Sequence, residues 1–343
     1  MLRCFMFARM MLVVVSLTLG STWVLGNADA NPVGKGLLVV TNQKEHTVLV
    51  VDPDARRELA KVVVGVNGHE VMVSKDGRFA YVPIYGNSGV GRPGTDGSTI
   101  DVVDLQARKL AATIDLGKPL RPHRAEWGPD GMLYVTAELG NAVDVLDPNT
   151  RKVVAEIPTG QQESHMLVIS PDGRRAYTAN VGAGSVSVLG LAKRNLITTI
   201  PVAKMVQRIS ISPDGKRVFT HDQDAPRIAV IDTATNKIAN WIEVPTSVYA
   251  SEPTPDGRWL VTLDRGGNAY VMDLESMKIA RRLKISDGAS EILIRPGGDI
   301  AYLSGTGAGK IDVLDLHTWE LEKPIELTPG VDGMAWVAGG AKE

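Results

Sequence analysis

Short runs of alternating apolar and polar residues fill most of the chain and are separated by clusters of Gly, Pro, Asn and Asp. The segment 164–205 shows the pattern: MLVIS, a PDG turn, RRAYTAN, a Gly-rich turn, SVSVLGL, a polar turn and LITTIPV. Short apolar runs that are rich in β-branched residues and end at turn formers are typical of antiparallel strands. The pattern therefore predicts four short strands in this segment.

The same unit recurs along the chain. An Asp-Gly pair, or Gly-Gly in its place, begins at positions 76, 130, 172, 214, 256 and 297, so that successive spacings are 54, 42, 42, 42 and 41 residues. The first interval is twelve residues longer than the next, and the extra residues lie in YGNSGVGRPGTDGST. Four strands repeated at this period are the signature of β-propeller blades.

The two ends of the chain complement each other. Residues 36–65 supply three strands with no first strand before them, and VDGMAWV at 331–337 resembles a first strand with nothing after it. Joining these segments completes one blade and leaves no open sheet edge. We therefore predict an all-β fold: a seven-bladed β-propeller of four-stranded antiparallel blades, closed by the C-terminal strand, in a single domain at 31–343.

Several segments carry a family resemblance. VVTNQ, LYVTAE, AYTANVG, ISPDGRRAY and IAVIDTATNK resemble the YVTN family of β-propeller repeats, which includes YncE-like exported proteins. The resemblance extends over essentially the whole chain after residue 30 and implies the propeller fold. It implies no single function, because similar propellers serve as lactonases, lyases, cofactor-bearing oxidoreductase domains and binding modules.

Residues 1–30 have the features of a secretory signal peptide. Two arginines precede an apolar run, MLVVVSLTLG, which ends near the small-residue pattern Ala28-Asp29-Ala30. We expect cleavage near Ala30 and a periplasmic or secreted mature chain. An uncleaved anchor is the alternative, but glycine and hydroxyl residues interrupt the apolar run.

Composition narrows the remaining choices. The only cysteine, Cys4, lies in the predicted signal, so the mature chain needs no disulfide. No later stretch has the roughly 18 apolar residues of a membrane-spanning helix. Without residues 1–30 the chain has 35 basic and 38 acidic residues, which gives no indication of a nucleic-acid partner. We expect a monomer.

Three of the six histidines share one register: His69, His123 and His165 each stand seven residues before the turn Asp or its equivalent. The first strand of a blade is innermost, so these side chains are predicted at the top mouth of the central channel. Gln207, Tyr249 and Ser290 occupy the same register in the next three blades.

Further polar residues are predicted on the same face, mostly in the loops that join second and third strands. They are His46, Tyr85, Glu138, Asn180, His221, Asp222, Asp264 and Arg265. The twelve extra residues fall at 86–97, beside His69. Residues 86–97 either form a flap that covers the mouth or are a disordered surface loop without a function.

Two interpretations of the histidines stay open. Three neutral imidazoles on rigid strands, with water or Gln207 completing the shell, suit a divalent transition metal such as Mn, Fe, Cu or Zn. The second interpretation is a metal-free polar mouth, with or without a bound ligand. Near the same mouth, Glu70, Glu163, Glu252 and Glu291 are candidate second-shell or acid–base groups.

The sequence supports three hypotheses of function. The leading one is a small-molecule or metal site at the mouth, with metal-assisted lyase or lactonase-type chemistry if the protein is an enzyme. The second is a non-catalytic periplasmic propeller that binds or scaffolds an envelope component. The third is an oxidoreductase-associated propeller that holds copper, iron or haem. Candidate acid–base residues are Glu70, Tyr249, Glu252 and His221.

Glycine-rich segments do not change these hypotheses. GVGRPG at 89–94 matches a nucleotide-binding pattern, but a strand rather than a helix is predicted after it, so no helix N-terminus is available for a phosphate.

Overall fold

The computed structural model describes Met1 and residues 36–90 and 92–339. The chain divides after Val33, and all described strands belong to the unit that follows. The predicted signal peptide lies outside the described residues, except for Met1. Within those residues, no helix has the length and apolar character needed to cross a membrane.

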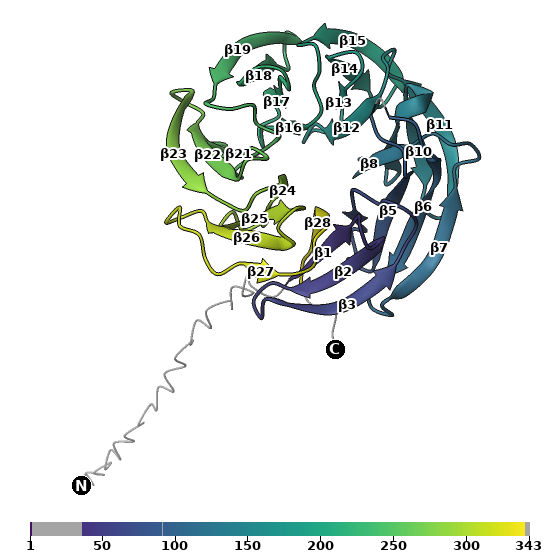
Figure 1. The fold of residues 1–343 in the computed structure, drawn as a ribbon, viewed down its shortest axis with the longest axis horizontal. Helices are drawn as coiled ribbons and strands as arrows, with labels where there is room; N and C mark the ends of the chain where they lie inside the picture. The colour runs from purple at the N-terminus through teal and green to yellow at the C-terminus, as the bar shows by residue number, and fades with distance from the viewer. Residues whose placement is uncertain (2–35, 91, 340–343) are drawn as a thin grey trace. The chain divides into compact units, whose positions relative to one another are not determined.

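Seven sheets of four antiparallel strands form the propeller (Figure 1). The innermost strands are β4 (Met72–Val73), β8 (Pro122–Trp127), β12 (Ser164–Ile169), β16 (Ile209–Ile211), β20 (Ala250–Pro253), β24 (Ala289–Ile294) and β28 (Val331–Val337). The second strands are β1 (Leu37–Asn42), β5 (Phe79–Gly86), β9 (Leu133–Ala137), β13 (Arg175–Asn180), β17 (Arg217–His221), β21 (Trp259–Leu263) and β25 (Ile300–Gly305).

The outer strands complete each blade. The third strands are β2 (Thr47–Asp52), β6 (Asp96–Asp104), β10 (Ala142–Asp147), β14 (Ser185–Gly190), β18 (Arg227–Asp232), β22 (Asn268–Asp273) and β26 (Lys310–Asp315). The fourth strands are β3 (Arg57–Val63), β7 (Lys109–Asp115), β11 (Lys152–Pro158), β15 (Asn195–Pro201), β19 (Lys237–Glu243), β23 (Lys278–Lys284) and β27 (Ile325–Glu326). A 3₁₀ turn, η1 (Glu138–Gly140), follows β9.

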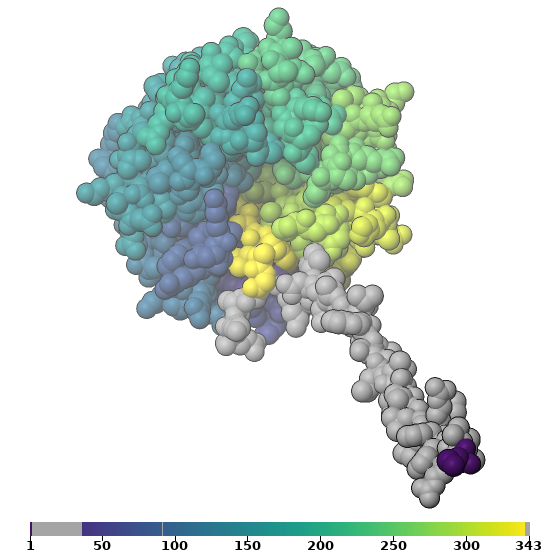
Figure 2. Space-filling view, turned by 180° about the vertical axis from the view of Figure 1, so that it is seen from behind, coloured from purple at the N-terminus to yellow at the C-terminus, as the bar shows by residue number. Residues whose placement is uncertain are grey.

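The ring closes through strands from opposite ends of the chain. β28 pairs with β1, and the register runs from Leu37 opposite Val337 to Asn42 opposite Val331. In Figure 2 the yellow C-terminal residues lie directly against blue residues from the first part of the ring. The predicted all-β seven-bladed fold and its closure by the C-terminal strand are thus confirmed.

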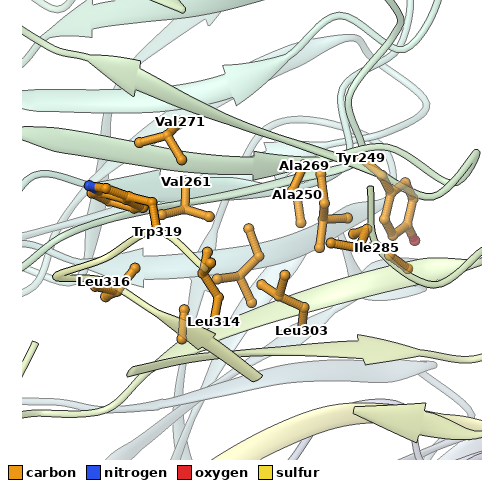
Figure 3. Close-up of a cluster of buried hydrophobic side chains, with 14 residues drawn as sticks. Tyr249, Ala250, Val261, Ala269, Val271, Ile285, Leu303, Leu314, Leu316 and Trp319 are labelled. Carbon is orange, nitrogen blue, oxygen red and sulfur yellow. The ribbon is translucent and has the colours of Figure 1, made fainter. Parts of the chain in front are cut away.

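Apolar side chains fill the spaces between neighbouring blades. Figure 3 shows one such cluster between the β20–β23 and β24–β27 sheets, where Val271, Leu303 and Leu314 are fully buried. Burial stabilises each such Val or Leu side chain by roughly 1.5–3 kcal/mol. Because every blade packs on two neighbours, the inner strands are held rigidly around the channel.

The turns between first and second strands fix the register of the inner strands. Asp76 accepts hydrogen bonds from the Ser74 hydroxyl and the Arg78 amide. The next residue, Gly77, has a φ of +69°, in the left-handed region that favours glycine. Asp172 makes equivalent contacts in a later blade, so equal offsets from the turn place residues at corresponding heights.

Candidate functional site

The structure brings three imidazoles together at the channel mouth. His123 lies in β8, His165 in β12, and His69 just before β4. The ring centroids of His69 and His123 are 5.3 Å apart, and those of His123 and His165 are 3.6 Å apart with planes tilted by 32°. The Tyr85 ring meets His69 and His123 edge-on at 5.0 and 5.3 Å. Together these four side chains form one wall of a cavity of about 670 Å³, here called the upper cavity.

A buried carboxylate orients His69. The Nδ1 atom of His69 lies 3.2 Å from Asp332 Oδ2, which also accepts a hydrogen bond from Gln43. Burial opposes ionisation of Asp332, but the hydrogen bond and charge of His69, together with Arg208, lower its pKa. If His69 Nδ1 carries the proton that faces Asp332, its Nε2 has a free lone pair. The His69 side chain is 23% exposed.

A second carboxylate holds His165. Glu138, fully buried in η1, contacts His165 Nδ1 and accepts a 2.8 Å hydrogen bond from the Tyr85 hydroxyl. On the other side of His165, the Gln207 amide lies 3.2 Å from Nε2. Burial, and then the nearby Glu138 charge, raise the pKa of Tyr85, so its hydroxyl keeps its proton and remains a donor.

His123 lies between the other two imidazoles without a partner for one of its nitrogens. Its Nδ1 is buried and has no hydrogen bond to any described residue. Burial lowers the pKa of His123 well below its ordinary value, and the neighbouring His165 and His69 lower it further. His123 is therefore a neutral imidazole, the form that binds a metal.

Seven residues, one from each blade, surround the mouth at the level of these histidines. Strand pairing places Asp332 in the register of His165, since Val331 pairs with Asn42 as Ser164 pairs with Asn180. Sequence reasoning missed Asp332, although it is the second residue of the VDG segment that begins the closing strand. The mouth ring consists of His69, His123, His165, Gln207, Tyr249, Ser290 and Asp332.

Below the mouth ring, the next residues along four inner segments form a network of ion pairs, here called the septum: Glu70, Arg124, Arg208 and Glu291. Glu70 accepts 2.8 Å hydrogen bonds from both arginines, and Arg124 lies 3.3 Å from Glu291. Sequence reasoning found the two glutamates but missed both arginines. The register could have identified the two arginines, because each stands one residue after a member of the mouth ring.

The structure separates the predicted residues into two groups. The upper cavity is lined by His69, His123, His165, Gln207, Tyr85, Tyr249, Ser290 and Arg265. The remaining residues do not line it: His46, Glu70, Glu138, Glu163, Asn180, His221, Asp222, Glu252, Asp264 and Glu291.

The residues outside the cavity have structural surroundings of their own. Burial lowers the pKa of the fully buried His221 to about 3. Asp222 pairs with Arg227, and Asp264 accepts hydrogen bonds from Asn268 and Thr246. Asn180 makes hydrogen bonds with Ser164, Ser185 and Ser187. His46 accepts a hydrogen bond from the backbone amide of Asn67. Glu70 belongs to the septum, and Glu252 lies below the septum.

The 86–97 insertion borders the upper cavity. Ser88, Gly89, Val90 and Arg92 contribute to its lining. Arg121 fastens the insertion, because it binds Asp96 at 2.8 Å and the Gly89 carbonyl at 3.3 Å. The same guanidinium lies 3.4 Å from Glu138. Arg121 therefore connects the 86–97 insertion to the carboxylate that holds His165.

A three-ligand metal cluster is not preformed. In the described part of the chain, no three His, Cys, Asp or Glu side chains are grouped so that they could hold one metal ion. His165 uses both of its ring nitrogens for other contacts, since Nδ1 contacts Glu138 and Nε2 lies 3.2 Å from the Gln207 amide.

Comparison with known proteins gives a partial family match. Residues 34–166 match the model of the cytochrome D1 heme domain. The match covers less than half of the chain and includes all three clustered histidines. Comparison with curated proteins finds no match. The resemblance to YVTN repeats stays a prediction.

Solved structures share the fold at low identity. Hydrazine synthase of Kuenenia stuttgartiensis has a TM-score of 0.64 and 19% identity, over 78% of this chain and 88% of that one. Dihydro-heme d1 dehydrogenase NirN, in complex with DHE, has a TM-score of 0.64 and 18% identity, over 90% and 76%. A functionally unknown protein from Desulfotomaculum acetoxidans DSM 771 has a TM-score of 0.72 and 14% identity, over 88% and 98%. The chain is thus a seven-bladed propeller that is similar, over residues 34–166, to the cytochrome D1 heme domain.

Proposed function

We propose that the upper cavity binds a haem-type tetrapyrrole and that histidine from the mouth ring ligates its iron. The observation that carries this proposal is the row of three imidazoles facing a cavity of about 670 Å³, within the segment that matches a haem domain. That volume is in the range of roughly 300–1,000 Å³ found for cofactor and ligand pockets.

The residues present fit such a group. His69 is the histidine that would best hold the iron, because Asp332 binds its Nδ1 and part of the side chain is open to the cavity. His123 offers a second neutral imidazole with an unpartnered nitrogen. Tyr85 and Tyr249 supply aromatic surface. A bound haem would supply one-electron or oxygen chemistry at its iron.

Two arginines suit the carboxylates that such macrocycles carry. Arg92 and Arg265 line the upper cavity, and no ion pair joins either side chain to a described residue. The Arg265 guanidinium lies 3.9 Å from the centroid of the Tyr249 ring, which orients it without neutralising its charge. We propose that these arginines bind carboxylates at the rim of the macrocycle.

Titration with hemin tests the proposal. Mature chain without a histidine tag should bind hemin with a shifted Soret band. The variant His69→Ala should weaken binding about tenfold or more, as expected for the loss of about 1.4 kcal/mol or more. His317→Ala is the matched control, since that histidine lies in an exposed turn between β26 and β27. Equal binding by both variants, or no binding by the wild-type chain, would refute the proposal.

The two carboxylate–imidazole pairs also favour a second candidate, a divalent metal such as Mn, Fe, Cu or Zn. Elemental analysis of the same untagged protein distinguishes the two, because metal without tetrapyrrole absorbance supports this candidate. Residues 1–30 are proposed to direct export to the periplasm, and a mature mass that begins at Asn31 would support cleavage near Ala30.

A further inference from the structure

A second, smaller cavity lies in the channel below the septum. Its volume is about 260 Å³, and we call it the lower chamber. Arg208 lines both cavities, whereas Arg124, Glu126, Glu252 and Glu291 line only the lower one. Neither the haem proposal nor the family match makes use of these carboxylates.

Carboxyl groups outnumber cationic groups in this part of the channel. Two arginines face five carboxyl groups: Arg124 binds Glu70 and Glu126, and Arg208 binds Glu70, while the Arg208 Nε has no partner among the described residues. The carboxylates are Glu70, Glu126, Glu252, Glu291 and Asp332. The two arginines therefore cannot pair with all five carboxyl groups, and an unpaired one either keeps its proton or needs another cation.

Two of the chamber carboxylates lack strong partners. Glu252 has no hydrogen bond or ion pair with any described residue. Glu291 is only 7% exposed, and its Oε1 lies 3.3 Å from Arg124. Its Oε2 has no hydrogen-bond partner within the described chain, and the Arg208 guanidinium is 3.8 Å from that oxygen. Burial raises the pKa of Glu252 to about 8, although Arg124 opposes the rise. A buried acceptor left unpaired costs stability that a bound cation would restore.

The remaining walls determine which cation fits. Aliphatic inner-strand residues such as Val168, Ile211 and Leu293 form part of the lining beside the charged groups. A metal ion would need several oxygen ligands around one point, and the described residues contain no group of three that provides them. An ammonium head on a short alkyl chain matches both the carboxylates and the apolar walls. At about 30 Å³ per water, the chamber has room for roughly nine water-sized groups.

We propose that the lower chamber is a separate binding site for a small alkylammonium ion, with Glu252 and Glu291 binding the ammonium group. The site lies beyond the septum from the mouth ring, and its argument does not use the haem proposal. Nothing in the upper cavity needs to be filled for it to bind.

Calorimetric titration of the mature chain with 1,4-diaminobutane tests this proposal, with sodium chloride at matched ionic strength as the reference. Glu252→Gln should weaken binding about tenfold, because it removes a charge-assisted hydrogen bond. Glu275→Gln, at an exposed position in the turn after β22, is the control and should bind as wild type does.

Folding and hemin binding are checked in the same variants. A circular-dichroism melt and a hemin titration that match the wild-type results confine the effect of Glu252→Gln to the lower chamber. The proposal is overturned if wild-type chain fails to bind the diamine, if both variants bind it equally, or if only divalent metal ions bind. Failure of hemin binding alone would leave this result unchanged.

Discussion

At the scale of single residues, the mouth depends on carboxylates that act through histidines. Glu138 is fully buried and contacts His165, Tyr85 and Arg121. A buried charge of this kind is tolerated only when it is paired and hydrogen-bonded. Glu138 therefore fixes the orientation of His165 without lining the cavity itself.

We expect Glu138→Ala to destabilise the protein by about 3 kcal/mol, because it leaves a buried guanidinium, hydroxyl and imidazole without their common partner. Urea unfolding measures the change. Leu139→Ala at the neighbouring position is the control, since Leu139 is 44% exposed and its loss should change stability by less than about 1 kcal/mol. Equal effects of the two substitutions would contradict the assigned role of Glu138.

At the scale of elements, an Asp in the third strand recurs in several blades. Asp101 of β6 accepts from the Gly65 amide at 2.7 Å, and Asp312 of β26 accepts from the Ser286 amide at 2.7 Å. These contacts fasten the segment that enters each blade. Asp144 of β10 is also buried, but its Oδ1 has no hydrogen-bond partner among the described residues. Aspartate in the third strand thus stabilises the blades of β6 and β26, whereas the unpartnered Asp144 destabilises the blade of β10.

Burial, with Glu156 nearby, raises the pKa of Asp144 to about 6. A carboxyl whose pKa is higher in the folded state binds protons more tightly there, so stability falls as the pH rises from about 4 to about 6. We therefore expect Asp144→Asn to increase stability by roughly 1–3 kcal/mol at pH 8 and to have little effect at pH 3.5. Denaturant unfolding at both pH values measures this.

Asp101→Asn is the matched control for that measurement. Asp101→Asn should decrease stability by about 1 kcal/mol. The amide nitrogen of asparagine cannot accept a hydrogen bond, and it replaces one of the two carboxylate oxygens of Asp101 that do so. If Asp144→Asn also lowered stability at pH 8, the carboxyl of Asp144 would have a favourable partner in solution, and the argument from its burial would be wrong.

At the scale of the whole molecule, ring closure and the mouth share residues. Gly333 of β28 donates its amide to the His69 carbonyl at 2.9 Å, and the Thr41 hydroxyl donates to the same oxygen at 2.8 Å. A Cβ added at Gly333 would lie 2.3 Å from that carbonyl oxygen. The close approach of these two segments therefore requires a residue without a side chain.

Gly333→Ala should lower stability by about 1–3 kcal/mol, because the added methyl group overpacks the seam. It should also displace His69 and weaken hemin binding. Gly307→Ala is the control for stability alone, since a Cβ there would meet no atom nearer than 3.5 Å, but Gly307 lines the upper cavity. Thermal melting of both variants and hemin titration of Gly333→Ala against wild type measure the two effects, and unchanged behaviour of Gly333→Ala would separate ring closure from the site.

The fold was predictable from the sequence because blade period and turn chemistry are local, repeated signals. The height of the mouth-ring residues followed from their constant offset to the turn. Side-chain direction did not follow, so Glu138 and His221 could not be separated from true lining residues. Asp332 was missed because its blade is assembled from both ends of the chain, and Arg124 and Arg208 were missed because their partners lie in distant blades.

The septum affects how a molecule can move along the central channel. Glu70, Arg124, Arg208 and Glu291 are joined by ion pairs, and Arg208 lines the cavities on both sides of them. A molecule that passed from one cavity to the other would therefore have to separate these charged side chains, whereas exit from the upper cavity by way of the 86–97 insertion would leave them in place.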